Sequence, residues 1–325
     1  GNRNELETEI LSKICLELIF PFNNFHYHTF FLPANRNFYP NFYKYIYSVS
    51  KEEKDTIGHE LGNGANLERI KTLAKRPYTQ PMDELNTRIF NLNNNRTPTG
   101  HYEDLLTELE EIIGGEIEVI SVEGIAPIEF RLKIAEGKSL DMHVASSSSN
   151  QLTTLYLYLK YWAAERRNFL ILDEPEENLH PKNQLKLLEL LIKFSKRNDN
   201  RILITTHSTL LSDSINNHLH LGHLKQEGFD LEAVAKEKDL HIDANAILEP
   251  DETGVYFFNG SRIFEYDVND YGVVFGDFET EERKVRNDGD ALRGMIYNHL
   301  KEQRRKNHEK VKAEREQKLQ QTKDA

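Results

Sequence analysis

Two apolar runs, each followed by polar side chains, stand out in the pattern of hydrophobic and polar positions along the chain. The first is Phe169–Leu172, which ends at Asp173 and Glu174, and the second spans Ile202–Thr205 and has His207 as its polar tip. Apolar runs without alternation are typical of strands buried on both faces of a parallel sheet. Open α/β sheets bind ligands at the carboxyl ends of such strands. The pattern therefore predicts an α/β fold with two adjacent central strands, and with Glu174 and His207 at the same edge.

Apolar residues at helical spacing predict several helices around these strands. They occur within Glu5–Phe20, Leu105–Ile113, Leu152–Trp162 and Leu185–Ile192. The second of these helices is followed by Gly114, a residue type that commonly closes a helix in the left-handed conformation. Strands and helices thus alternate along the chain, as an α/β fold requires.

Two further stretches predict antiparallel strands. Residues 116–144 have the pattern of a meander, and Gly254–Tyr266 that of a hairpin around an Asn-Gly turn. Within the meander, Gly137–Ser139 is similar to the end of a phosphate-binding loop. That motif needs a glycine where this chain has Leu132, and it needs a helix afterwards. We therefore interpret this segment as a hairpin turn.

The composition narrows the class of protein. Of the 325 residues 38% are hydrophobic and 29% charged, and no apolar run reaches the ~18 residues of a membrane helix, so we expect a soluble protein without a membrane partner. The single cysteine, Cys15, excludes an internal disulfide framework and fits a reducing, cytoplasmic location. The net charge of −12 argues against bulk electrostatic binding of nucleic acid. The charged tail from Lys301 onward is the best candidate for a local contact with nucleic acid or a protein partner.

The two acids after the first apolar run are candidates for two different roles in catalysis. In such a pair one carboxylate, here Asp173, holds a divalent metal directly or through water, while the next, Glu174, polarises an attacking water. The alternative is a solvated acidic turn, since two acids before a proline such as Pro175 are common. Three other stretches of the sequence agree with the chemical interpretation.

The residues FLILDEPE, Phe169–Glu176, resemble a Walker B motif with its catalytic glutamate. The following ENLHP resembles the D-loop of the ABC-type ATPases that are grouped with the OLD-like and SMC-like chromosome and defence ATPases. ABC transporters usually carry an aspartate where this chain has His180. The resemblance implies that Asp173 is the metal ligand, that Glu174 is catalytic and that His180 is among the nucleotide-binding residues.

Two shorter stretches extend this resemblance. Ser148, Ser149, Asn150 and Gln151 stand where the family carries its Ser-Gly-Gly-Gln signature, which reaches across a dimer to the partner's ATP, although both glycines are replaced. A serine-rich helix N-cap would look similar. His207 resembles the switch histidine, a second catalytic residue that contacts the γ-phosphate, and the alternative is a capping or solvent-facing histidine.

A third stretch, Phe25–Asn37, alternates like a strand and ends in Pro33, Ala34, Asn35 and Arg36. It resembles the strand in soluble ABC-type ATPases that closes on a similar turn near the nucleotide. Two interpretations of Arg36 follow. Its guanidinium faces phosphate, or it is solvated beside the turn.

The resemblance implies a P-loop NTPase-like ABC ATPase head with a helical insertion and a small β-rich C-terminal part. The expected divisions are 1–45, the start of the ATPase core; 46–115, the helical insertion; 116–215, the core with signature, Walker B, D-loop and switch histidine; 216–300, a C-terminal α/β part; and 301–325, a charged helical tail. The P-loop is missing from the 325 residues. We therefore expect an incomplete head, whose P-loop comes from an N-terminal segment or a partner chain.

The resulting hypothesis is ATP binding and hydrolysis, with ATP and Mg²⁺ bound, by a homodimer or larger assembly in phage defence or DNA maintenance. The expected partners are ATP, a second copy, and a fragment bearing the P-loop or an effector protein. The alternative is a non-hydrolysing module that senses nucleotide or holds partners together. The two differ in whether the reading frame continues upstream into a Gly-rich GK[ST] loop.

Overall fold

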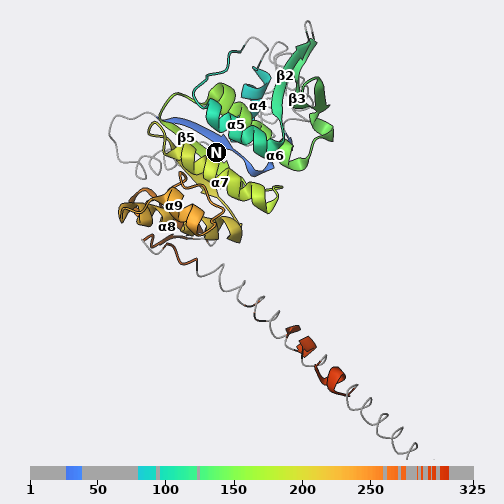
Figure 1. Cartoon of the computed structure of the whole chain (residues 1–325). Coiled ribbons are helices and arrows are strands. Elements are labelled where there is room, and N and C mark those ends of the chain that lie inside the picture. Colours follow the sequence, from blue (N-terminus) through green and yellow to red (C-terminus); the bar gives the residue numbers. More distant parts are fainter. Residues whose placement is uncertain are drawn as a thin grey trace, which may run out of the picture. The chain divides into compact units, whose positions relative to one another are not determined.

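A computed structural model describes most of the chain between residues 27 and 275 (Figure 1). The described residues are 27–38, 80–92, 96–122, 125–258, 262–269, 272–275 and, within the C-terminal helix, 284, 287, 292–293, 295–297 and 301–306. The predicted helix within Glu5–Phe20, much of the insertion and the end of the tail lie outside these residues. The chain divides into two compact units, Gly1–Glu252 and Thr253–Ala325.

A parallel sheet forms the centre of the first unit. Its strands are β1 (His28–Leu32), β5 (Asn168–Asp173) and β6 (Arg201–Thr205), in the order β1-β5-β6. Both pairings are parallel, and Leu172 lies opposite Ile204 in the register. The prediction that the two apolar runs form adjacent strands of an α/β sheet is confirmed.

Strand β6 differs from the prediction in one respect. Among the described residues β6 is an edge strand, not a central one. Its residues alternate between exposed and half-buried, and Leu203 is 47% exposed. An apolar run indicates a strand with two apolar faces, but whether both faces are covered depends on elements that are distant in the sequence.

One helix fills the core beside this sheet. Helix α6 (Ser147–Leu157) continues as a π-helical turn, η3 (Tyr158–Trp162), and every residue from Ser149 to Leu157 is buried. A helix that is buried all round belongs in the interior of a domain. It packs with helices α5 (Glu103–Ile113) and α7 (Pro181–Ser195) near the parallel strands (Figure 1).

The meander and its hairpin form as predicted. Strands β2 (Glu116–Val122), β3 (Ile125–Ala135) and β4 (Lys138–Asp141) pair antiparallel in sequence order, and helix α4 (Gln80–Phe90) precedes them. Gly137 has a φ of +68° in the turn between β3 and β4. Because Lys138 begins a strand rather than a helix, the rejection of a phosphate loop here is confirmed. Gly114 closes α5 at a φ of +90°, which confirms the predicted C-cap.

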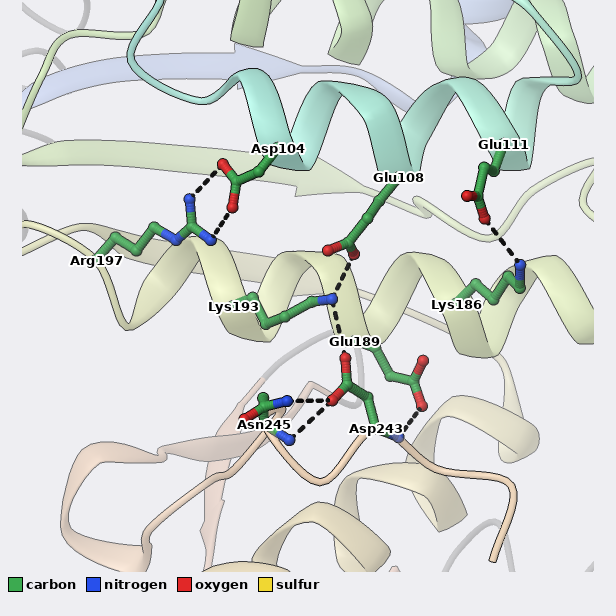
Figure 2. Close-up of polar contacts among 9 residues, drawn as sticks. All are labelled: Asp104, Glu108, Glu111, Lys186, Glu189, Lys193, Arg197, Asp243 and Asn245. Carbon is green, nitrogen blue, oxygen red and sulfur yellow. Dashed lines mark hydrogen bonds and ion pairs between the residues drawn. The ribbon is translucent and has the colours of Figure 1, made fainter. Parts of the chain in front are cut away.

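Helices α5 and α7 face one another through oppositely charged side chains (Figure 2). Each of three acids on α5 pairs with a base on α7 or just after its end: Asp104 with Arg197, Glu108 with Lys193, and Glu111 with Lys186. Lys193 also contacts Asp243 at 3.0 Å. Hydrogen bonds from Arg197 hold the pKa of Asp104 below its ordinary value. Because these pairs are largely solvent-accessible, they fix the register of the two helices more than they add stability.

A buried polar network holds the amino end of β5. The Tyr102 hydroxyl accepts hydrogen bonds from the side-chain amides of Asn168 at 2.9 Å and Asn200 at 3.0 Å, and it lies 3.0 Å from the Ala164 carbonyl oxygen, to which it donates. Tyr102 and Asn168 are fully buried. The network therefore ties the start of α5 to the starts of β5 and β6.

The Tyr102→Phe variant is expected to lower the free energy of unfolding by about 1 kcal/mol. The substitution keeps the ring but removes an acceptor for two buried amide groups, which retain other partners. Denaturant titration of the purified chain measures the effect. Tyr256→Phe, at a hydroxyl-bearing ring that is 59% exposed, is the control and should be neutral. Equal stability of both variants would contradict the assigned role of the network.

Two helices and a docked segment complete the first unit. The helices are α8 (Thr209–Gln226) and α9 (Leu231–Glu237). The docked segment is residues 246–248, which lie along α8. The Leu248 N–H donates to the His218 carbonyl at 3.2 Å, and the ring nitrogen Nδ1 of His218 lies 2.6 Å from the Ala246 carbonyl. A Cβ added to Gly222 would lie 2.0 Å from the Leu248 carbonyl oxygen. The segment therefore approaches the helix closely only because residue 222 is a glycine.

The second unit contains the predicted hairpin. Strands β7 (Val255–Phe258) and β8 (Ile263–Tyr266) pair antiparallel, and their connecting turn lies outside the described residues. Helical residues continue to 306, in the part of the tail that the structure describes. Across the described residues, no helix combines the length and the apolar character that crossing a membrane would require.

Candidate functional site at the carboxyl edge of the parallel sheet

The ends of β5 and β6 bring the predicted catalytic side chains together. Asp173 is the last residue of β5 and lies opposite Thr205, the last residue of β6. The Thr205 hydroxyl donates a hydrogen bond to the Asp173 carboxylate. His207 follows two residues later, so that its side chain starts from the same edge. The expected placement of Glu174 and His207 at one edge is confirmed.

Glu174 presents its carboxylate to His207. The distance from Glu174 Oε1 to His207 Nε2 is 3.4 Å, and the side chains are 35% and 87% exposed. The Glu174 N–H donates to the Thr205 carbonyl at 3.0 Å, which continues the pairing of the two strands by one residue. The carboxylate and the imidazole are thus adjacent, and both are open to a ligand from outside the subunit.

The backbone at Glu174 has an unusual conformation. Its φ is +44°, in the left-handed region that residues other than glycine rarely adopt. Strained conformations of this kind cluster at functional sites and persist where surrounding contacts hold them. Here the positive φ ends the extended conformation of β5 directly after Asp173.

His180 has a structural contact at the end of the same turn. It is the N-cap of α7, where its ring nitrogen Nδ1 accepts a hydrogen bond from the Lys182 N–H at 3.3 Å, and Pro181 follows at the first helical position. Its side chain is exposed. This geometry explains a histidine before proline at this point, and the contact of His180 with nucleotide remains a prediction.

The start of α6 differs from the arrangement that the signature resemblance implies. Ser146, not Ser148, is the N-cap and accepts from the Ser149 N–H. The side chains of Ser149, Asn150 and Gln151 are buried and donate within the subunit, to the carbonyls of Ile113, Met142 and Ala34 respectively. Direct contact of these three with nucleotide remains a prediction that would require these bonds to break. Ser148 is half-exposed at the helix start, where its hydroxyl lies 2.9 Å from the Ser146 hydroxyl.

Two of the carbonyls at the end of α5 are bound by neighbouring helices. Ser149 donates to the Ile113 carbonyl at 3.0 Å, and the Asn183 side chain donates to the Ile112 carbonyl at 3.4 Å. The last carbonyls of a helix have no partner within it. The starts of α6 and α7 therefore supply donors for the end of α5.

Both sequence interpretations of Arg36 are wrong. The residue lies in a short 3-10 turn, η1 (Ala34–Phe38), and is only 1% exposed, so it is not solvated. Its guanidinium donates to backbone carbonyls, among them those of Asp173, Glu174 and Pro175, and does not face an open site. Burial lowers the pKa of Arg36 to about 10, and the surrounding acids oppose this shift.

The edge offers oxygen ligands of the kind that Mg²⁺ prefers. The Asp173 carboxylate and the Thr205 hydroxyl lie in contact at the strand ends. Among the described residues, no group of three His, Cys, Asp or Glu side chains is placed to hold a metal. Mg²⁺ is commonly held by one or two protein oxygens together with substrate phosphates. The residues present therefore fit a metal that arrives with a nucleotide.

The comparison with known families agrees with this geometry. No curated protein matches the chain. The model of the family described as AAA ATPase domain matches residues 5–211, which include the parallel sheet, the acidic turn and His207. Proteins of this family bind and hydrolyse ATP, and generally use Mg²⁺. The chain belongs to the AAA ATPase domain family.

Proposed function

We propose that this chain is the catalytic part of a dimerising ABC-type ATPase of the OLD-like and SMC-like group. The observation that carries the proposal is the juxtaposition of Glu174 and His207, 3.4 Å apart, beside Asp173 at the carboxyl edge of a parallel sheet. This edge is where open α/β sheets bind their ligands. A carboxylate and an imidazole that are both accessible there suit water activation and phosphate stabilisation.

In this proposal each side chain has a distinct role. Glu174 orients or deprotonates the attacking water, and His207 steadies the γ-phosphate. Asp173, whose carboxylate is oriented by the Thr205 hydroxyl, would hold Mg²⁺ directly or through water. A bound Mg²⁺ would neutralise charge on the phosphates. The strained backbone of Glu174 fixes the direction in which its carboxylate approaches the water.

A second copy would complete the nucleotide site through the start of α6. The first N–H groups of a helix lack partners within the helix and attract anions. Ser148 adds an accessible hydroxyl at this point. The next three side chains are buried and bound within the subunit, whereas the Ser148 hydroxyl, within the part of the chain that the structure describes, contacts only the exposed Ser146 hydroxyl. We therefore assign the contact with the partner's nucleotide to Ser148 and the first N–H groups of this turn.

The P-loop has to come from elsewhere. No G-x-x-x-x-G-K-[ST] motif occurs in the 325 residues. Among the described residues β6 has a strand on only one side. A P-loop follows a strand and precedes a helix. If that strand paired parallel to β6, its loop would lie at the edge that holds Glu174 and His207. We propose that an N-terminal segment or a partner chain supplies it.

The purified 325-residue chain is expected to hydrolyse ATP no faster than its Glu174→Ala variant. A P-loop binds phosphate through its backbone N–H groups and its lysine, and the chain lacks this loop. A steady-state phosphate-release assay compares the two, and the same pair is then measured in a form that includes the P-loop. In that form, only the protein that retains Glu174 should hydrolyse ATP. If the 325-residue chain hydrolysed ATP faster than its Glu174→Ala variant, the proposal that the P-loop comes from another segment or chain would be overturned.

The second candidate is a non-hydrolysing module that senses nucleotide or holds partners together. The inward hydrogen bonds of Ser149, Asn150 and Gln151 favour it, since they leave fewer groups for a partner's nucleotide. Under this alternative the form with a P-loop would bind ATP without turnover. A role in phage defence or DNA maintenance is proposed from the resemblance alone.

A further inference from the structure

We propose that Arg36 is a positioning residue for the reaction, which holds the turn after β5 in the strained conformation that presents Glu174. The inference rests on the proposed function, in which the Glu174 carboxylate acts on water. It concerns a residue that touches neither the carboxylate nor any exposed surface of the site. Arg36 acts only through the backbone of the acidic turn.

The hydrogen bonds of Arg36 bracket the strained residue. Nη1 donates to the Asp173 carbonyl at 2.7 Å, and Nη2 donates to the carbonyls of Glu174 at 3.3 Å and Pro175 at 3.0 Å. These carbonyls stand before, at and after the residue with positive φ. On the other side the Glu174 N–H is bound by Thr205. Both peptide groups of Glu174 are therefore held, which a strained conformation requires if it is to persist.

Only arginine can make this set of contacts. Its guanidinium is a planar fork with several donors, whereas lysine offers a single flexible ammonium group. Nη1 also donates to the Pro33 carbonyl at 3.1 Å, so the side chain ties its own turn to the acidic turn. With 1% of the residue exposed, the surroundings leave little room for water to replace a missing donor. A buried charge is costly, which implies a specific reason for its presence.

The turn that carries Arg36 is itself anchored to α6. The Gln151 side chain, fully buried, donates to the Ala34 carbonyl at 3.0 Å. This bond joins the start of α6 to η1, and η1 to the acidic turn through Arg36. The start of α6, which we assign to the partner's nucleotide, thus supports the turn that carries Glu174.

Amide hydrogen exchange on the 325-residue chain tests the mechanical part of the proposal. Arg36→Met removes the donors at similar volume, and Arg36→Lys retains a cation. We expect the Glu174 and Glu177 amides to exchange at least ~10-fold faster in Arg36→Met, with a smaller effect in Arg36→Lys. Leu172, within β5, should keep its protection. Arg131→Met, at a half-exposed arginine of β3, is the matched control and should change none of these amides.

ATP turnover in a form that includes the P-loop tests the positioning role. In Arg36→Met kcat should fall at least ~10-fold while KM for ATP changes less than ~3-fold, because binding groups stay in place and only the Glu174 approach is lost. Arg36→Lys should recover part of kcat. Arg131→Met should match the unmodified protein in both parameters.

Three outcomes would overturn the proposal. They are unchanged exchange at Glu174, an equal loss of protection throughout β5 and α6 in both Arg36 variants, and parallel changes in kcat and KM. The second outcome would mean that Arg36 serves folding alone. If the unmodified form with the P-loop does not hydrolyse ATP, the proposed function fails, and the exchange measurement still decides whether Arg36 holds the turn.

Discussion

Replacing Glu174 by glutamine is expected to lower ATP hydrolysis ~10²-fold or more in a form that includes the P-loop, which is the usual scale for loss of a general base. Glutamine keeps the size of the side chain and its hydrogen-bonding capacity, but it cannot accept a proton from water. Nucleotide should still bind, because the change leaves Asp173 and His207 in place. The effect should therefore appear in kcat and not in KM.

The control for this experiment lies outside the site. Glu136→Gln makes the same chemical change at an exposed position between β3 and β4, and should leave hydrolysis close to the unmodified rate. A second measurement is molar mass by light scattering. Glu174→Gln should accumulate as an ATP-dependent dimer, and adding Ser148→Arg should abolish that dimer by obstructing the partner's phosphate. A mass that ignores ATP would favour the scaffold alternative, and unchanged hydrolysis would remove Glu174 from the mechanism.

Replacing Gly222 by alanine is expected to lower the free energy of unfolding by about 3 kcal/mol, at the upper end of the usual cost of overpacking. The new Cβ would lie 2.0 Å from the Leu248 carbonyl oxygen. A backbone atom cannot swing aside as a flexible side chain can, so the segment 246–248 must separate from α8. Alanine gains at most about 1 kcal/mol over glycine within a helix, which is too little to offset this separation.

The measurement is denaturant unfolding of the 325-residue chain. Asn217→Ala, at an exposed position of the same helix, is the control, because it changes helix propensity without a clash. It should be neutral or slightly stabilising. If Gly222→Ala were as stable as this control, residues 246–248 would not be held against α8 in the way the structure describes.

The sheet and the edge that holds the proposed catalytic residues were predictable because their signals are local. An apolar run followed by polar residues marks the end of a buried strand, and two such runs in α/β order suffice to place Glu174 near His207. The spacing of Leu152, Leu155 and Tyr156 likewise sufficed to predict a helix at this position. In each case neighbours in the sequence carry the information.

The contacts that orient the site were not predictable in this way. Arg36 binds carbonyls that lie 137 to 139 residues away. The inward orientation of Asn150 and Gln151 depends on which carbonyls pack against α6. The edge position of β6 depends on elements outside its own sequence. Gly222 carries no signal within its helix, since the atom that requires a glycine belongs to Leu248.

The shared attachment of two helix starts to α5 has a consequence for motion. Ser149 and Asn183 bind adjacent carbonyls, those of Ile113 and Ile112, so neither α6 nor α7 can shift at its start without pulling on the same helix end. The ion pairs along α5 and α7 resist sliding in the other direction. A displacement imposed at the start of α6 should therefore reach His180, at the start of α7. We expect it to be transmitted as a rigid-body rotation, with no unfolding or repacking between the two points.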